Sequence, residues 1–347
     1  MQTRIVCILI IFVLLAFWRT GHAEKQQWEK WTESQHPPVD AKLPPIWCKA
    51  VKYRGQRVPI SESIKGSGKH CVVHDFVQRK SRDLISGRQR GSPINDAGTG
   101  NILTFFESSN VDLDLQNHLV SGSPFEDTRG IGTKGIELCF LKVHNGKIET
   151  PGRLGISIEM ASGDSNIRKR IEMMKEDISI IIKTNWNGEN QNFNEIPWDY
   201  SPPTFYTAEN LQIKSGGRAI IMAGSDNVVR NNTIEVDGRT AVYLYGPRSL
   251  VEGNTFIVHM DPRDKAPLPA ILKLRDADGS IIRSNRFIVK RSGLFRKKEE
   301  EPQAGINLLE SKGVVIEGNV FEEITLPVRK DAASTTTESG NISKGSP

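Results

Sequence analysis

The chain has 347 residues, of which 25% are charged, and its formal net charge is +5. A balance this close to neutral does not indicate nucleic acid, and no nucleic-acid-binding motif accompanies it. It is compatible with an acidic polysaccharide as a partner. Beyond the N-terminus no stretch is apolar enough to span a bilayer, so we expect no stable membrane span.

The N-terminus has the parts of a secretory signal peptide. Arg4 supplies positive charge, residues 6–18 form an apolar run, and Gly21-His22-Ala23 ends the run with small residues. This pattern predicts a signal peptide over residues 1–23 and a secreted or periplasmic protein. An uncleaved anchor is the alternative.

Residues 24–100 show little periodicity and begin with a stretch rich in Trp, Pro and Lys. We expect an N-terminal cap and entry segment that covers the first regular strands. An exposed aromatic surface for sugar rings is the alternative. Because export permits disulfides, Cys48 and Cys71, which flank a Gly- and Ser-containing segment, are predicted to pair.

Regular strands are predicted from about residue 101. Residues 111–115 alternate strictly, with Asp112 and Asp114 on the face opposite the aliphatic side chains. Two carboxylates at this spacing could bind a cation or take part in acid–base chemistry. They could equally serve only to keep an outer face hydrated, and both interpretations stay open.

A long segment over residues 184–208 carries several aromatic residues, Trp198 among them, between Asn and Pro residues. Long loops in compact domains are usually functional or disordered, and the aromatic content argues against disorder. Stacking on sugar rings and packing against the wall of the fold are both compatible with this composition.

Residues 218–328 contain segments that repeat one pattern. Each has two aliphatic residues, a charged residue, a small turn-forming residue, an Asn, any residue, and a large apolar residue. β-forming residues on both sides of a turn-former predict strand, bend, strand, with the Asn side chains stacked as a ladder. The segments are 228–234, 250–256, 281–287 and 315–321, and the ladder residues are Asn232, Asn254, Asn285 and Asn319.

Another short strand precedes each of these segments. Its period of two places aliphatic side chains on one face and polar or aromatic side chains on the other. A single coil cannot bury its apolar side, whereas a stack of coils with parallel strands can. The outward set comprises Tyr243, Tyr245, Lys273, Arg275 and Asn307.

The repeats resemble those of right-handed parallel β-helix proteins, the superfamily that includes pectate lyases and polygalacturonases. The resemblance implies an all-β, right-handed parallel β-helix over residues 101–328. Polygalacturonase-type enzymes carry Asn-x-Asp, Asp-Asp and Gly-His-Gly in successive coils, and this combination does not occur here. The Asp-rich calcium pattern of pectate lyases is also not evident, which puts catalysis in doubt.

The spacing of the ladder residues indicates where a site would lie. The intervals are 22, 31 and 34 residues, and the extra residues fall in 259–267 and 291–303. Both insertions follow the same strand of the coil, so we expect them to wall a groove floored by the outward side chains. The candidate catalytic residues are Lys273, Arg275 and Asp276, and the candidate substrate-binding residues are Tyr243, Tyr245, Asn307 and Trp198.

These patterns predict an exported β-helix protein that binds an anionic polysaccharide as a monomer. Lyase, hydrolase or epimerase activity stays open, and a non-catalytic scaffold or surface-interaction protein is the alternative. No cofactor and no metal cluster is expected, although Asp276 and Asp278 leave calcium open. The residues from 329 to 347 lack an apolar period and are predicted to be a disordered tail.

Overall fold

The computed structural model describes residues 48–52, 62–77, 101–106, 108–122, 129–134, 139–151, 154–158, 205–238, 240–260, 270–291 and 304–345. In these ranges every regular element is a β-strand, and all strands lie in the compact unit Lys49–Pro347. No helix in the described ranges is long and apolar enough to cross a membrane. The predicted signal peptide, Trp198 and most of both predicted insertions lie outside the described residues.

The strands form two parallel sheets, one of nine strands and one of 17. The nine-stranded sheet comprises β2 (Glu62–Ile64), β5 (Asn101–Phe106), β8 (Arg129–Lys134), β10 (Leu154–Ile158), β12 (Ile220–Ala223), β15 (Val242–Tyr245), β18 (Leu272–Arg275), β21 (Ile306–Leu309) and β24 (Val328–Lys330). The 17-stranded sheet comprises β1 (Lys49–Val51), β3 (Gly68–Val72), β4 (Phe76–Val77), β6 (Val111–Asp114), β7 (Leu119–Ser121), β9 (Leu141–Thr150), β11 (Thr207–Ser215), β13 (Val228–Arg230), β14 (Thr233–Asp237), β16 (Leu250–Glu252), β17 (Thr255–Met260), β19 (Ile281–Arg283), β20 (Arg286–Arg291), β22 (Val314–Glu317), β23 (Val320–Glu322), β25 (Thr336–Ser339) and β26 (Ile342–Lys344).

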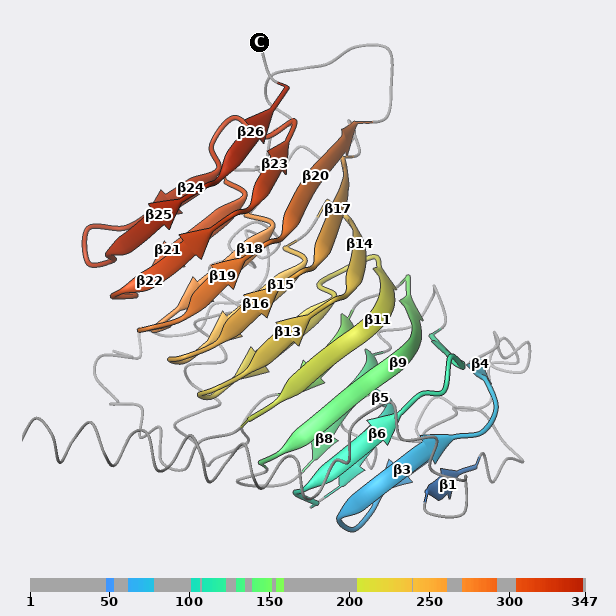
Figure 1. The fold of residues 1–347 in the computed structure, drawn as a ribbon. Helices are drawn as coiled ribbons and strands as arrows, with labels where there is room; N and C mark the ends of the chain where they lie inside the picture. Colours follow the sequence, from blue (N-terminus) through green and yellow to red (C-terminus); the bar gives the residue numbers. More distant parts are fainter. Residues whose placement is uncertain are drawn as a thin grey trace, which may run out of the picture. The chain divides into compact units, whose positions relative to one another are not determined.

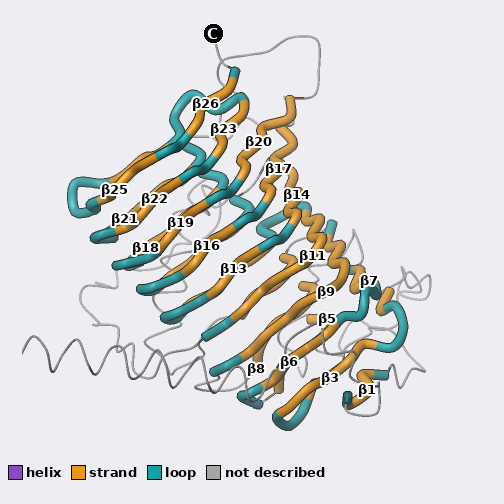
Figure 2. Tube along the Cα trace, in the orientation of Figure 1, coloured by secondary structure: helices purple, strands orange, loops and turns teal. Residues whose placement is uncertain are grey.

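The chain winds in stacked coils (Figures 1 and 2). From β12 onward each coil supplies one strand to the nine-stranded sheet and then two to the 17-stranded sheet. In β9 and β11 the two strands of the coil are fused into one long strand, so β11 pairs with both β13 and β14. Every strand pairs with strands of the neighbouring coils, so sequence-distant residues become lateral neighbours.

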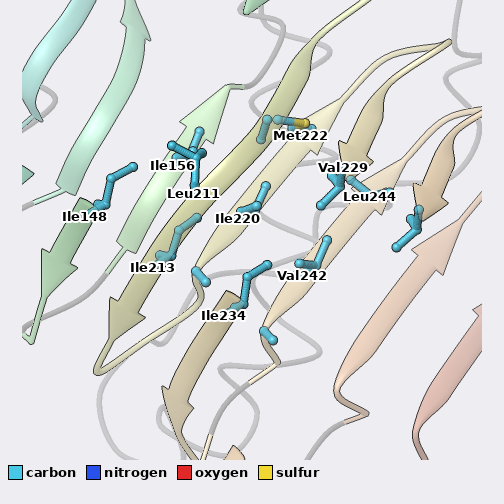
Figure 3. Close-up of a cluster of buried hydrophobic side chains, with 14 of the residues drawn as sticks. Ile148, Ile156, Leu211, Ile213, Ile220, Met222, Val229, Ile234, Val242 and Leu244 are labelled. Carbon is cyan, nitrogen blue, oxygen red and sulfur yellow. The ribbon is translucent and has the colours of Figure 1, made fainter. Parts of the chain in front are cut away.

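The predicted inward face is the core. Ile220, Val242, Leu272 and Ile306 stand in register across successive coils, and all are fully buried. Figure 3 shows the same packing for Ile220, Val242 and their neighbours between the two sheets. Aromatic residues also stack along the coils, because Phe256, Phe287 and Phe321 share one register with ring centroids 4.8 and 4.9 Å apart.

The bends that carry the Asn residues have left-handed backbone. The residue before each Asn has φ between 55° and 65°, at Asn231, Gly253, Ser284 and Gly318. Residues that tolerate positive φ are therefore required there, as the small turn-formers of the repeat indicate.

The asparagine side chains form a continuous ladder. Nδ2 of Asn254 donates to Oδ1 of Asn285 at 2.9 Å and to the carbonyl of Val229 at 2.8 Å. Oδ1 of Asn254 accepts from the backbone N–H and from Nδ2 of Asn232. Each interior amide thus has its hydrogen-bonding capacity used along the stack.

The C-terminal segment differs from the expectation of a disordered tail. Strands β25 and β26 pair in parallel with β22 and β23 and add one more coil. The ladder continues into it, since Nδ2 of Asn319 donates to Oδ1 of Asn341 at 3.1 Å. Polar side chains such as Thr336 and Ser343 stand in register with Val314 and Phe321, so β25 and β26 end the stack without continuing its apolar rows. Sequence periodicity misses it for that reason.

The described cysteines are of two kinds, disulfide-bonded and free. Cys48 and Cys71 are both disulfide-bonded, and Cys71 is buried in β3. The pairing of one with the other stays a prediction. Cys139 is a half-buried free thiol.

Candidate functional site

The predicted groove floor lies on the outer side of the nine-stranded sheet, but part of it is covered. Tyr243 and Tyr245 are 0% and 2% exposed, and they belong to a second apolar cluster with Leu154, Ile221 and Ala223. The prediction that these tyrosines offer exposed faces to sugars is therefore wrong. Strand alternation identifies the side of a sheet on which a side chain lies, but it does not tell whether that side is covered.

Lys273 is also buried, with 5% of its surface exposed. Its Nζ lies 5.0 Å from the ring centroid of Tyr243, and Cζ of Arg218 lies 5.7 Å from the same centroid. Cationic groups at these distances from an aromatic ring form cation–π contacts. The expected exposed base at Lys273 is thus part of a packed contact.

The other two candidate catalytic residues, Arg275 and Asp276, hydrogen-bond to the neighbouring coil. The guanidinium of Arg275 donates to Glu310 at 3.0 Å, and Asp276 has a left-handed backbone at the turn after β18. Nearby, a carboxylate oxygen of Asp278 accepts from the backbone N–H of Lys312 at 2.7 Å. Arg275, Asp276 and Asp278 are neighbours in the sequence, and each of them hydrogen-bonds to a residue of the next coil.

One outward row of this sheet becomes progressively more exposed. Lys273, Asn307 and Arg329 stand in register on β18, β21 and β24, and we call them the basic row. Lys273 is buried, Asn307 is half-buried and Arg329 is exposed. The accessible part of the predicted site therefore lies at the C-terminal coils.

The outer face of the 17-stranded sheet carries charges in a different arrangement. Glu209, Arg230, Glu252 and Arg283 stand in register on β11, β13, β16 and β19. The Nε atom of Arg230 lies 2.6 Å from Glu209, and that of Arg283 lies 2.6 Å from Glu252. Acid and base alternate from coil to coil, so this row neutralises itself.

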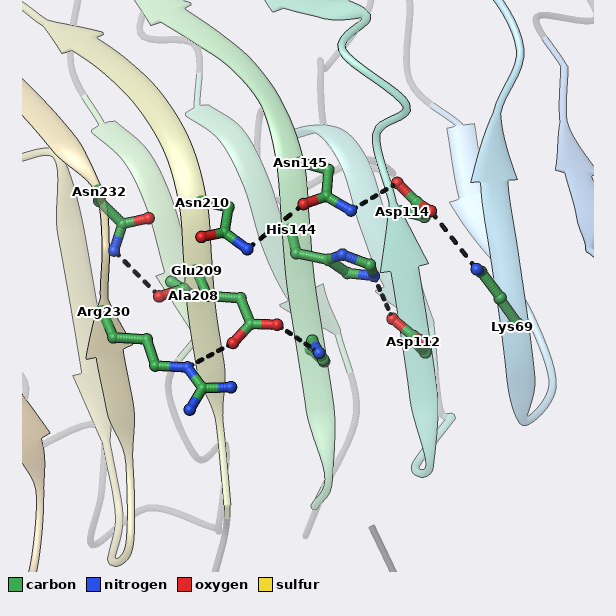
Figure 4. A network of polar contacts seen from close by, with 11 residues as sticks. Lys69, Asp112, Asp114, His144, Asn145, Ala208, Glu209, Asn210, Arg230 and Asn232 are labelled. Atoms are coloured by element: carbon green, nitrogen blue, oxygen red, sulfur yellow. Dashed lines mark hydrogen bonds and ion pairs between the residues drawn. The ribbon is translucent and has the colours of Figure 1, made fainter. Parts of the chain in front are cut away.

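The N-terminal end of the same face holds a buried cluster of ionisable side chains (Figure 4). Nε2 of His144 lies 2.6 Å from Oδ1 of Asp112, and these residues are 3% and 6% exposed. Lys69 pairs with Asp114 at 3.5 Å. We call Asp112, Asp114, Lys142, His144 and Glu209 the acid–histidine cluster.

Glu209 is the most completely paired member of this cluster. It is 2% exposed, and its carboxylate contacts both Lys142 and Arg230. Burial alone would raise the pKa of Glu209, but the two cations outweigh it, so the pKa of this carboxyl is lowered. Glu209 therefore stays ionised.

The pattern at 111–115 pointed to this region, because it placed Asp112 and Asp114 on one outer face. His144, Lys142 and Glu209 were not identified from the sequence. Leu141-Lys142-Val143-His144 does alternate, yet only the register of β9 on β6 places its polar residues beside the two aspartates. Across the described ranges, no group of three or more His, Cys, Asp or Glu residues is positioned to hold a metal ion.

Parallel strands that wind through two sheets in stacked coils define a parallel β-helix. Residues 201–345 match the family model described as the right handed beta helix region, so this part of the chain is a right-handed β-helix as predicted. No curated protein and no solved structure matches the chain. The strand topology and the family match establish the fold, and neither of them identifies a substrate.

Proposed function

We propose that the protein is an exported β-helix protein that binds an anionic polysaccharide at the basic row. The observation that carries the proposal is a contrast between two outer faces. On the 17-stranded sheet, acids and bases alternate in register. In the basic row, the register positions are Lys273, Asn307 and Arg329, without an acid among them.

The geometry of a parallel sheet suits a polymer. Neighbouring strands lie about 4.8 Å apart, so a chain laid across them meets one side chain of the row per coil. Arg329 can form paired hydrogen bonds with a carboxylate, and Asn307 can bond hydroxyl groups. Lys273 stands next to Asn307 in the row and is buried.

Export is supported by the signal-peptide pattern at the N-terminus and by the disulfide-bonded state of Cys48 and Cys71. Disulfides persist mainly in oxidising compartments outside the cytoplasm. A polysaccharide of a cell surface or surrounding matrix would be encountered there.

Charge reversal at the accessible end of the row tests the proposal. Affinity electrophoresis of the chain through gels containing polygalacturonate, alginate, hyaluronan or chondroitin should show retardation by at least one polymer. Arg329→Glu should lower the affinity about tenfold or more, since it replaces an attraction by a repulsion.

Lys290→Glu is the matched control, because Lys290 is exposed on β20 in the other sheet and the charge change is the same. It should leave the affinity within about twofold. Equal weakening by both variants would mean that only net charge matters, and the basic row would then not be the site.

A further inference from the structure

We propose that Asn231 is the acceptor of an N-linked oligosaccharide. The inference rests on the proposed export of the chain, because the sugar is attached in a secretory pathway by a membrane-bound oligosaccharyltransferase. It concerns the bend between β13 and β14 on the 17-stranded sheet, whereas the basic row lies on the nine-stranded sheet.

The segment Asn231-Asn232-Thr233 has the acceptor pattern of this modification, which is Asn, any residue except Pro, and then Ser or Thr. A bulky glycan also requires its Asn to lie on the surface. Asn231 and Thr233 are both exposed, and the ladder residue Asn232 between them is buried. The bend therefore exposes the two residues that the transferase recognises and keeps the ladder residue inside.

The side-chain amide of Asn231 is available for the transfer. In the described part of the chain it forms no hydrogen bond, whereas the amide of Asn232 donates to the carbonyl of Ala208 and to Asn254. The next coil leaves space beside it, since a Cβ added to Gly253 would lie only 2.6 Å from Oδ1 of Asn231. The glycine at this position thus accommodates the amide of the neighbouring coil.

The transfer needs a sugar donor, which is an oligosaccharide linked to a lipid through pyrophosphate. A bond forms between Nδ2 of Asn231 and the anomeric carbon of the first sugar. The bond from that carbon to the pyrophosphate oxygen breaks. One amide proton is lost, and the lipid pyrophosphate leaves with the electron pair of the broken bond.

The two preceding coils supply an internal comparison. Asn145 and Asn210 stand at the same bend in register with Asn231, and all three have left-handed backbone with φ between 54° and 57°. Asparagine tolerates this backbone, which accounts for the residue type in all three coils. Only Asn231 has a hydroxyl residue two positions later, since a lysine follows Asn145 and Gln212 follows Asn210 at that spacing.

A second acceptor pattern occurs at Asn341-Ile342-Ser343, but Asn341 is less suited to carry a glycan. It is half-buried, and its Nδ2 donates to the carbonyl of Ile316 at 3.0 Å. Its Oδ1 accepts from Nδ2 of Asn319 as the last rung of the ladder. We therefore expect a higher occupancy at Asn231 than at Asn341.

The test is expression of the full chain in cultured animal cells, once with its own N-terminus and once with residues 1–23 replaced by a secretory signal of known activity. Peptide N-glycosidase converts a glycosylated Asn to Asp, so mass spectrometry of peptides from cells and medium locates each glycan. We expect a glycan on Asn231 in both forms. An unmodified Asn231 in the form with the supplied signal would overturn the inference.

Two substitutions at the hydroxyl position make the test specific. Thr233→Val keeps a β-branched side chain on the exposed face of β14 but removes the hydroxyl, so the glycan on Asn231 should be lost. Thr233→Ser should retain it. A glycan on Asn231 that persists in a folded Thr233→Val variant would contradict the assignment.

Gln212→Thr is the matched gain-of-site variant. Gln212 stands in register with Thr233, and the substitution gives the exposed Asn210 the same pattern at the same bend. The variant should therefore carry a glycan on Asn210 in addition to the one on Asn231.

This inference and the proposed function fail separately. A chain that stays in the cytosol with its own N-terminus, but carries a glycan on Asn231 with the supplied signal, would refute export and retain the acceptor. Polymer binding that depends on Arg329, by a chain whose Asn231 stays unmodified with the supplied signal, would refute the acceptor and retain the basic row.

Discussion

At the scale of the residue, the buried asparagines show how a polar side chain can stabilise a core. Asn254 is 1% exposed and bonds to the coils on both sides. The amide is suited to this because it offers two donors and an acceptor with two lone pairs. Replacement by an apolar residue would leave buried groups on two neighbouring coils without partners.

We therefore expect Asn254→Ala to lower the free energy of unfolding by about 2–4 kcal/mol. Asn341→Ala should cost clearly less, because Asn341 ends the ladder and is only half-buried. Urea denaturation of both variants measures the difference. Equal losses of unfolding free energy would show that an interior ladder residue contributes no more than the terminal one, which would contradict this account.

Glu209 gives a prediction for pH. Its pKa is lowered in the folded chain, so its contribution to stability is present above the ordinary glutamate pKa of about 4.3 and is lost as the pH falls through the folded value. The gap in unfolding free energy between the wild-type chain and Glu209→Gln should shrink as the medium is acidified from neutral. A gap that is constant or widens would contradict the ion-pair account.

At the scale of the element, the repeat pattern predicts strands, bends and inward residues well, because each depends on local chemistry. Val251, Phe256 and Leu272 are buried as their alternation requires. Whether an outward residue is buried depends on whether other residues cover that side of the sheet. Tyr243 and Lys273 have the alternation of exposed residues and are buried, whereas Arg329 on the same sheet is exposed.

The stacked rings of Phe256, Phe287 and Phe321 connect equivalent strands of three coils. Phe287→Ala should cost about 3–5 kcal/mol, because the central ring loses packing on both faces and leaves a cavity. Phe287→Leu should cost less, as most of the volume remains. Thermal unfolding followed by circular dichroism gives the order, and an alanine variant as stable as the leucine variant would contradict it.

At the scale of the whole molecule, the stack ends at a coil that no longer continues the apolar rows of the 17-stranded sheet. In β25 and β26 of this coil, Thr336, Glu338 and Ser343 occupy the register of Val314, Ile316 and Phe321, whereas Val328 in β24 still packs against the core. Composition alone predicts disorder for β25 and β26, because these strands are held by backbone hydrogen bonds and the continued ladder.

Limited proteolysis distinguishes a folded last coil from a disordered tail. Glu338 is exposed but lies within β25, so a protease specific for glutamate should cut there slowly under native conditions. Cleavage at the rate of an unfolded peptide would mean that the last coil does not form. Glu338 in a heat-denatured sample supplies the reference rate.

The central claim, that the basic row recognises an anionic polymer, is tested most directly by one calorimetric comparison. The chain is titrated with the polymer that retards it, and with the same polymer after its carboxylates have been reduced to alcohols. We predict binding to the first that weakens as salt is raised, and a loss of most affinity for the second. Equal affinity for both forms would contradict recognition through charge and would return the β-helix to the role of a scaffold.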